Sequence, residues 1–409
     1  MGSRKNGLLP RILGGDLEPG LAPVLTAVGL SITAMYAFWT YFAVWLIQEL
    51  DMAKGDVGLA YLAAAGVGIC GGLAGGAVSD RVGRKPVILF GAVAQTVLAA
   101  ALLFPGLPVA GAVAILALLT LCSPVRGAAT QALVADLIPP ERREAAFGSM
   151  RVAFNTGALA GPVIGAGLVT IGWDALHAGC AVLWGISLLA ALRLPNLRPV
   201  AVAAGERPSF RAIVRAPAFG IFFVAALFGM TTYNAFETLM PVSLTQEHGY
   251  PPAAWGVLFV VNPLLVMLFQ LRVTRWSGGL SPGTKLGAAM LLMGASFLPL
   301  ALTTAPVVLV LLLVVFVAGE MLWAPASDAL ATKLAPVEAR GAAMGTLGIA
   351  TWIGGALAPA VGFRVADGAG DAAMWIAIAA IGAVAAALYS LAARAGRAQP
   401  AAEPLAEAA

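Results

Sequence analysis

The sequence predicts an all-α membrane protein of twelve transmembrane helices, arranged as two pseudo-symmetric bundles of six. Three observations lead to this fold class: an apolar composition, twelve apolar runs of membrane-spanning length, and an internal repeat. Of the 409 residues, 60% are hydrophobic and 11% are charged, whereas soluble domains carry about 25% charged residues. Lipid must therefore solvate much of the chain.

Twelve apolar stretches reach the length of about 20 residues that a helix needs to cross a hydrocarbon core of about 30 Å. Each is expected to be helical, because backbone donors and acceptors in lipid must be satisfied within their own segment. The first stretch follows a polar segment and is long enough to span, so we expect it to be retained rather than cleaved as a secretory signal. The stretches begin at Leu21, Val57, Pro86, Val109, Ala145, Ala175, Ala218, Ala253, Thr284, Val307, Ala342 and Ala372.

The basic residues predict the orientation. Of the 24 Lys and Arg residues, Lys54 and Arg364 alone fall on the side opposite the N-terminus, and Arg126 and Arg151 fall inside spans. By the positive-inside rule the side that carries the remainder is cytoplasmic, and both termini lie there. The two histidines fall in predicted external loops and are expected to be ordinary surface residues; they are His177 and His248.

An internal repeat predicts the domain organisation. Shifting the chain by 197 positions places Pro139 on Pro336 and Gly148 on Gly345, and the match continues without a gap through Pro162 on Pro359. Parallel repeats of this kind form two six-helix halves with a binding cavity between them. We therefore expect an N-terminal bundle at 1–195, a cytoplasmic linker rich in arginine at 196–217, a C-terminal bundle at 218–395 and a tail at 396–409.

A charged segment lies between the second and third apolar runs. Its glycines allow a tight turn and close helix approach, and a carboxylate at its centre would be favoured opposite a helix N-terminus, such as that of the eleventh span. Positively charged residues that only anchor the topology are the simpler alternative. The residues that define the pattern are Gly76, Asp80, Arg81, Gly83, Arg84 and Lys85.

This pattern resembles the cytoplasmic loop motif between the second and third helices of the major facilitator superfamily. The resemblance implies the major facilitator fold, in which Asp80 latches one half to the other when the cavity faces outward. It further implies that Arg81 pairs with an acid at the end of the fourth span, here Asp136. The related loop in the second half has lost the acidic position, so the predicted latch is one-sided.

The fifth span carries a second pattern, formed by Gly157, Gly161, Pro162 and Gly165. Small residues four apart let helices approach to backbone contact, and a proline frees a carbonyl and bends the helix. The pattern resembles the fifth-helix motif of drug:proton antiporters, except that Ala166 replaces the last glycine. The resemblance favours export over uptake and implies the twelve-helix drug:proton antiporter family of multidrug efflux transporters.

Ionisable residues inside spans are costly and are therefore candidates for function. They are Glu237 in the seventh span, Glu320 and Asp328 in the tenth, Arg126 in the fourth and Arg151 in the fifth. A carboxyl group in surroundings of low dielectric holds its proton more tightly, which suits it to carry a proton. Glu237 and Glu320 resemble the acids that multidrug exporters of the superfamily use for protons and cationic drugs, and Arg126 resembles a position used in proton coupling. A static Glu320–Arg126 ion pair is the alternative.

Aromatic and amide side chains are expected to line the cavity with these acids. Such a lining suits amphipathic organic cations, which gain from apolar burial and from cation–π attraction. Simple packing of aromatic residues at helical spacing is the alternative. The candidate lining residues are Tyr36, Trp39, Tyr41, Tyr233, Asn234, Phe236, Asn262, Phe316 and Trp323.

Together these patterns predict a proton-coupled exporter of small amphipathic compounds in the plasma (inner) membrane, working by alternating access. No ATP-binding loop, catalytic triad, metal cluster or cofactor loop occurs in the sequence, so an ion gradient must supply the energy and no enzyme activity is expected. The expected partners are substrate, protons and lipid, with no nucleic acid, and a monomer is the expected state. The alternatives are an exporter of one metabolite or lipid-like compound, or a membrane sensor that does not transport.

Overall fold

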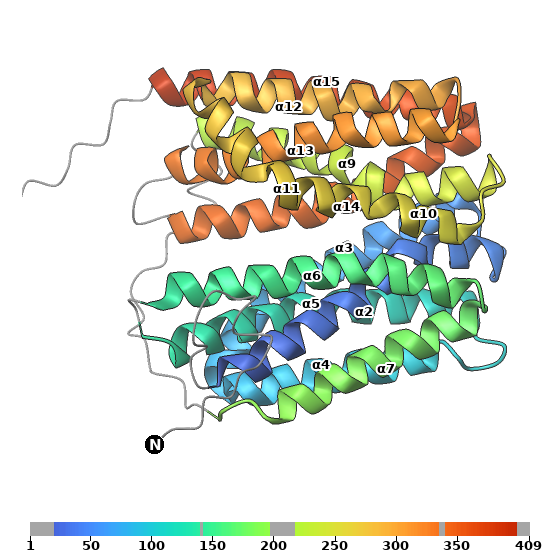
Figure 1. The fold of residues 1–409 in the computed structure, drawn as a ribbon, viewed down its shortest axis with the longest axis vertical. Coiled ribbons are helices and arrows are strands. Elements are labelled where there is room, and N and C mark those ends of the chain that lie inside the picture. The colour runs from blue at the N-terminus through green and yellow to red at the C-terminus, as the bar shows by residue number, and fades with distance from the viewer. Residues whose placement is uncertain (1–19, 140–141, 197–216, 335–339, 399–409) are drawn as a thin grey trace, which may run out of the picture. The chain divides into compact units, whose positions relative to one another are not determined.

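The computed structural model describes residues 20–139, 142–196, 217–334 and 340–398 (Figure 1). In this part of the chain all regular structure is helical, and it contains no strand. Most of the predicted linker and of the predicted C-terminal tail lie outside the described residues. The helices before the linker are α2 (Leu21–Gln48), α3 (Lys54–Val82), α4 (Arg84–Ala101), α5 (Val109–Leu137), α6 (Arg143–Val169) and α7 (Trp173–Leu192). Those after it are α9 (Pro217–Gln246), α10 (Pro252–Phe259), α11 (Val261–Trp276), η2 (Ser277–Gly279), α12 (Pro282–Ser296), η3 (Leu298–Ala301), α13 (Pro306–Leu334), α14 (Arg340–Ala369) and α15 (Asp371–Ala398).

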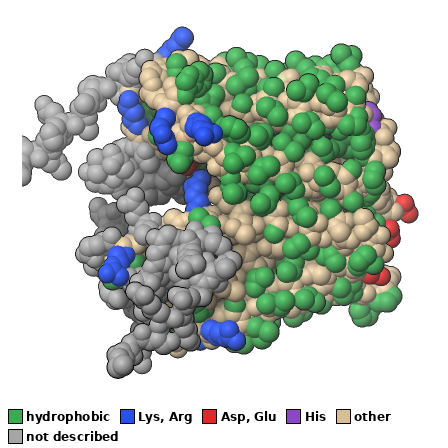
Figure 2. Space-filling model, in the orientation of Figure 1, with side chains coloured by type: hydrophobic (Ala, Val, Ile, Leu, Met, Phe, Trp, Pro, Cys, Tyr) green, Lys and Arg blue, Asp and Glu red, His purple; other side chains and the backbone are tan. Residues whose placement is uncertain are grey.

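Twelve segments of the described chain are long and apolar enough to cross a membrane. Each begins within a few residues of a predicted start, so the twelve predicted spans are confirmed. On the face seen in Figure 2, apolar side chains are spread over the described surface, and the Lys and Arg side chains lie toward the left of the view. Large apolar side chains such as Phe90 and Leu302 are exposed, as expected where lipid is the solvent.

The eighth span is interrupted near its middle. It consists of α10 and α11, which meet at Val260. Pro263 has no N–H group, so it cannot bond the carbonyl of Phe259 four residues earlier. The proline therefore accounts for the end of α10 at that residue.

The described helices fall into two compact units. Unit 1 comprises residues 1–51, 66–202 and 251–260, and unit 2 comprises 52–65, 203–250 and 261–409. The units differ from the predicted halves in two segments: the first part of α3 groups with unit 2, and α10 groups with unit 1.

The same helix neighbours recur in the two units. In unit 1, α2 packs on α6 and α7, and α4 packs on α5 and α7. In unit 2, α9 packs on α14 and α15, and α12 packs on α13 and α15. Each helix of the first set corresponds in chain order to one of the second, so the internal repeat in the sequence is a repeat of packing.

The two exchanged segments are held by equivalent contacts. In unit 1, a Cβ atom placed on Gly256 of α10 would come within 2.4 Å of the Pro162 carbonyl oxygen. In unit 2, a Cβ atom on Gly58 of α3 would come within 2.5 Å of the Pro359 carbonyl oxygen. Pro162 and Pro359 are the prolines that the repeat superimposes. Glycine is therefore required at both crossings for the backbones to meet.

One sequence prediction is wrong here. His177, expected at the surface of an external loop, is 1% exposed and lies in the second turn of α7. The helix already begins at Trp173, and this turn faces α2, where the Trp45 ring meets the imidazole edge to face at 4.6 Å. His248, in the connection between α9 and α10, is partly exposed, with Nε2 3.5 Å from Asp371 Oδ2.

Candidate functional site

Two acidic side chains of unit 2 lie near the same tyrosine. Glu237 lies on α9 with Tyr233 one turn before it, and the Tyr233 hydroxyl donates to Glu237 Oε1 at 3.3 Å. The same hydroxyl is within hydrogen-bonding reach of Glu320 on α13, and the two carboxyl groups are near enough to interact electrostatically. The spacing of four residues along α9 is what places Tyr233 and Glu237 on one face.

A third helix, α11, contributes a hydrogen-bond donor to this acidic pair. Asn262, in the first turn of α11, is 6% exposed and donates from Nδ2 to Glu320 Oε2 at 2.6 Å. Among the ion pairs of the described residues, none involves Glu237 or Glu320. Both acids are therefore held by neutral hydrogen-bond donors, with no positive charge committed to them in that part of the chain.

Aromatic rings form one wall of the acidic pair. The Tyr233 ring lies 6.0 Å from that of Phe316 and 5.7 Å from that of Trp323, and Phe236 stacks on Phe316 at 4.6 Å. The Trp323 indole N–H donates to the Tyr389 hydroxyl at 3.0 Å, which fixes its ring plane. Carboxyl groups beside aromatic faces can attract an organic cation both by charge and by the ring quadrupole.

Two other predicted residues of this unit point elsewhere. Asn234 donates to the Met230 carbonyl of its own helix, and its side chain lies against Gly355 of α14. Asp328, two turns beyond Glu320 on α13, is exposed. The structure therefore brings together Glu237, Glu320, Tyr233, Asn262 and Trp323 of the predicted set, and Asn262 is a direct hydrogen-bond partner of an acid.

Arg126 lies in the interior of unit 1, on α5, and is 5% exposed. Its guanidinium donates to Gln95 Oε1 at 2.7 Å, to Ser31 Oγ at 2.8 Å and to Ser187 Oγ at 2.6 Å. All of these acceptors are neutral, and the Ala27 carbonyl at 3.4 Å is a fourth. Within their own units, Arg126 and Glu320 each have neutral hydrogen-bond partners. Arg151, on α6, is exposed.

Sequence reasoning missed the partners of Arg126. Gln95 and Ser187 lie inside apolar spans and are 2% and 0% exposed. A buried polar side chain in a membrane helix needs a hydrogen-bond partner. The position of Gln95 within the third apolar span therefore indicates, from the sequence alone, that it bonds to a polar group of another helix. The pairing itself depends on how α4, α5 and α7 pack.

The charged loop between α3 and α4 is built around Arg84. Helix α3 ends at Val82, and Gly83 turns the chain with φ 106°, a value that favours glycine. Arg84, 7% exposed, then donates to Asp136 of α5 at 3.0 Å and to Asp80. The structure thus pairs Asp136 with Arg84, where the sequence predicts Arg81. Arg81 is exposed because it lies on the outer side of the last turn of α3.

Lys85 joins the same loop to a further helix. Its Nζ donates to the carbonyl oxygens of Leu192 and Leu194 at 2.9 and 2.7 Å, at the end of α7. A cation there satisfies carbonyls that have no partner within the helix. The segment from Asp80 to Lys85, where α3 ends and α4 begins, therefore ties these two helices to α5 and α7 within unit 1.

The glycines of α6 bring that helix into backbone contact with α2. A Cβ atom on Gly157 would lie 2.6 Å from the Gly29 carbonyl oxygen, and one on Gly161 would lie 2.6 Å from that of Thr33. One on Gly165 would meet the Tyr41 ring at 2.6 Å. These three positions form a single stripe along the helix, so no side chain fits between α6 and α2.

Pro162 and the predicted aromatics of α2 adjoin this stripe. The Tyr41 hydroxyl donates to the Pro162 carbonyl at 2.9 Å. The Tyr36 ring lies 6.1 Å from that of Phe154 and also from that of Phe259, and the Trp39 ring lies 5.8 Å from Phe38. In unit 1, Tyr36 and Trp39 therefore pack against other aromatic rings.

Comparisons with known proteins agree with this architecture. The chain is 28% identical over 369 residues to multidrug resistance protein MdtH of Klebsiella pneumoniae subsp. pneumoniae, covering 87% of this chain and 89% of that protein. It is 27% identical over 293 residues to MdtH of Shigella boydii, covering 70% and 71%.

Solved structures of transporters share the fold. A mutant form of the peptide transporter POT matches with a TM-score of 0.79 at 19% identity, covering 92% of this chain and 95% of that one. A mutant form of the nucleoside transporter NupG matches with a TM-score of 0.77 at 15% identity, covering 91% and 99%. The family described as Major Facilitator Superfamily matches residues 24–359. With twelve spans, repeated helix packing and this match over most of its length, the chain belongs to the major facilitator superfamily of membrane transporters.

Proposed function

We propose that this transporter exports small amphipathic organic compounds, cations among them, across the inner membrane in exchange for protons. The observation that carries the proposal is the acidic pair of Glu237 and Glu320, which share Tyr233 beside an aromatic wall. The likeness to MdtH, whose name describes a multidrug resistance protein, supports export of more than one compound.

The acidic pair supplies a direct means of coupling. A carboxyl group can bind either a proton or, in its charged form, an organic cation, so the two compete for the same oxygen atoms. Glu237 and Glu320 have neutral donors as partners, and they can exchange these without breaking an ion pair. Proton entry from one side would then release the compound, and proton loss to the other side would allow the next compound to bind.

Alternating access would carry the compound across the membrane, by rocking of residues 1–195 against 218–395. We further propose that the loop around Arg84 holds the cytoplasmic ends of its bundle together during that motion, with Asp80 reaching the other bundle. The ion pairs of Arg84 with Asp80 and Asp136 support a rigid loop. Both termini would lie in the cytoplasm.

The test is transport by the purified protein in proteoliposomes under an imposed pH gradient, with a panel of organic cations and neutral amphipathic compounds. Glu320→Gln and Glu237→Gln should each reduce proton-driven export by at least tenfold while the protein stays folded in detergent. Asp56→Asn, which neutralises an exposed acid of α3, is the matched control and should export normally. Near-normal pumping by both glutamine variants would refute the coupling scheme, and export of a single compound would indicate a dedicated exporter.

A further inference from the structure

Tyr389 of α15 connects the aromatic wall of the acidic pair to a second helix. It is fully buried, and its hydroxyl accepts the indole N–H of Trp323 on α13 at 3.0 Å. Because an indole nitrogen can only donate, the tyrosine keeps its own proton for another acceptor. Ser327 Oγ, one turn beyond Trp323 on α13, lies 3.4 Å from the same hydroxyl oxygen. Tyr389 thus contacts two successive turns of α13.

The Tyr389 ring is itself held in place by α9. Its centroid lies 5.8 Å from that of Phe222, with the two planes at 65°. A Cβ atom placed on Gly229 would come within 3.2 Å of the Tyr389 hydroxyl oxygen, so the missing side chain lets the ring lie against the helix. Gly229 stands one turn before Tyr233. The Tyr389 hydroxyl therefore has a defined position near the tyrosine that the two acids share.

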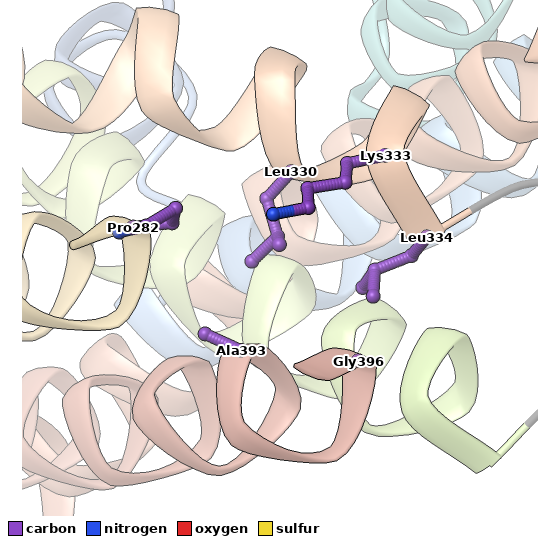
Figure 3. Close-up of a pocket in the computed structure, with 6 residues that line it drawn as sticks. All are labelled: Pro282, Leu330, Lys333, Leu334, Ala393 and Gly396. Atoms are coloured by element: carbon purple, nitrogen blue, oxygen red, sulfur yellow. The ribbon is translucent and has the colours of Figure 1, made fainter. Parts of the chain in front are cut away.

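At this level α13 and α15 meet through side chains. Helix α13 packs on α11 and α12, whereas α15 packs on α9, α12 and α14. One turn beyond Ser327 and Tyr389, the last turns of the two helices border a small pocket (Figure 3). Its lining consists of Pro282, Leu330, Lys333, Leu334, Ala393 and Gly396. The contacts of Tyr389 thus connect the two helices next to a region that side chains do not fill.

A hydrogen bond is not a general requirement of buried indoles in this protein. Trp184 of α7 is 1% exposed, and its indole N–H has no acceptor among the described residues. Its ring packs on that of Phe38 at 6.0 Å. Burial alone therefore does not explain why the indole of Trp323 has Tyr389 as its acceptor.

The orientation of Trp323 matters because its ring packs on Tyr233. The centroids of these two rings are 5.7 Å apart, and Phe316 lies 6.0 Å from Tyr233. The Tyr233 hydroxyl donates to Glu237 and is within reach of Glu320. A ring that packs on two others can move little, so Trp323 restricts where this hydroxyl lies.

We propose that Tyr389 is a positioning residue of the acidic pair. Its hydroxyl holds the Trp323 ring, and that ring keeps the Tyr233 hydroxyl within reach of both carboxyl groups. Tyr389 acts through these two rings rather than as a ligand of either acid. The inference rests on the proposed function, in which the two carboxyl groups exchange protons.

The titratable groups near these rings belong to α9 and α13. Glu237 and Glu320 face Tyr233, and Asp328 interacts electrostatically with Tyr389. Asp328 is exposed, unlike the two glutamates of the acidic pair. Its influence on Tyr389 therefore has to be separated from that of the acidic pair.

Infrared absorption by protonated carboxyl groups in the purified full chain tests the proposal without requiring transport. The share of the acidic pair is the signal that the double variant Glu237→Gln with Glu320→Gln lacks. Tyr233→Phe should change the proton concentration at the midpoint of this titration by about tenfold, since a hydrogen bond to a charged group is lost. Tyr389→Phe should change the midpoint in the same direction by about threefold, because the bond is then misplaced rather than removed.

Tyr250→Phe is the matched control. Its hydroxyl donates to the Thr304 carbonyl at 2.7 Å, elsewhere in unit 2, and removing it should leave the midpoint unchanged. Combined variants test whether the effect passes through the two rings. Adding Tyr389→Phe to Tyr233→Phe, or to Trp323→Phe, should produce no further change.

An unchanged midpoint in Tyr233→Phe or Tyr389→Phe would overturn the proposal, as would an additive effect of Tyr389→Phe and Trp323→Phe. Loss of the Tyr389→Phe effect in an Asp328→Asn background would also overturn it, because the tyrosine would then act through that acid. The proposed function fails on a separate result, the absence of proton-driven export by the unaltered chain in proteoliposomes. The titration of the acidic pair can depend on Tyr389 whether or not export is observed.

Discussion

At the scale of single residues, the Asn262 amide sets the orientation of the Glu320 carboxyl group. It donates to Oε2 at 2.6 Å and is itself buried, in the first turn of α11 just beyond the interruption at Val260. A hydrogen bond to a charged group in buried surroundings contributes about 1.5–3 kcal/mol. Asn262 is therefore the neutral residue most closely tied to the chemistry of the acidic pair.

Replacing Asn262 with Ala should lower the rate of proton-driven export by about tenfold and change its pH profile, because the carboxyl group loses its fixed donor. Gln270→Ala is the matched control: Gln270 also lies on α11 and donates to α13, but to the Met321 backbone carbonyl at 3.0 Å. Transport across a series of pH values measures both. Equal transport by the two variants would mean that Asn262 serves only to hold α11 against α13. That result would leave the coupling proposal open, because Glu320→Gln tests it separately.

At the scale of helices, the glycine stripe of α6 determines how closely two spans pack. Gly157 and Gly161 meet backbone oxygens of α2 at distances that leave no room for a Cβ atom. The equivalent helix of unit 2 does the same: a Cβ atom on Gly354 of α14 would lie 2.4 Å from the Leu227 carbonyl oxygen of α9. Glycines thus allow the close crossing of α6 with α2 in unit 1 and of α14 with α9 in unit 2, so the close crossing occurs in both repeats.

Gly161→Ala should destabilise the protein by about 1–3 kcal/mol, because the added methyl group forces α6 away from α2. Gly167→Ala, on the same helix, is the matched control, since a Cβ atom there meets nothing within 4 Å. It should be neutral or slightly stabilising, by up to about 1 kcal/mol, from helix propensity. Thermal unfolding in detergent compares the two, and an equal melting temperature for both variants would contradict the packing argument.

At the scale of the whole molecule, Arg84 ties the charged segment between α3 and α4 to its own bundle, and the proposed latch requires the same segment to act on the other bundle. Arg84 holds both Asp80 and Asp136, but Asp80 is the more exposed of the two acids, at 49% against 25% of the side chain. Asp80 is therefore the acid with surface left for a second partner. Because the two acids differ in exposure, substituting each in turn can distinguish the proposed contact with the other bundle from the ion pairs with Arg84 inside this bundle.

Asp80→Asn should shift the population toward opening on the cytoplasmic side, and Asp136→Asn should do so less. Each variant removes one of the two ion pairs that Arg84 forms. A larger shift with Asp80→Asn than with Asp136→Asn would therefore reflect a contact of Asp80 other than its ion pair with Arg84. Asn155 is a half-buried residue of α6, and a cysteine introduced there would report on access. The measurement is the rate at which this cysteine reacts with a reagent added from the cytoplasmic side, in a background without the native cysteines. Equal rates in the two variants would restrict the role of Asp80 to its own bundle.

Much of the site could be predicted because it depends on spacing within one helix. The spacing of four residues places Tyr233 on the face of Glu237, and the spacing of the α6 glycines makes one stripe. The pairing of Asp136 could not be predicted, since it depends on which side of the turn at Gly83 faces α5. The sequence predicts His177 at the surface because a short loop and the first turns of a helix look alike in sequence, whereas the structure buries it in the second turn of α7.

The amino-acid sequence alone determined that the chain spans a membrane twelve times, that its halves repeat, and which ionisable residues lie within the spans. These properties follow from hydropathy, chain length and helical periodicity, which are local. Only the tertiary structure decided that Asn262 holds Glu320, that neutral groups surround Arg126, and that α10 groups with the opposite half of the chain. Those results depend on which helix faces which, and the periodicity of a single helix specifies a face but not the neighbour packed against it.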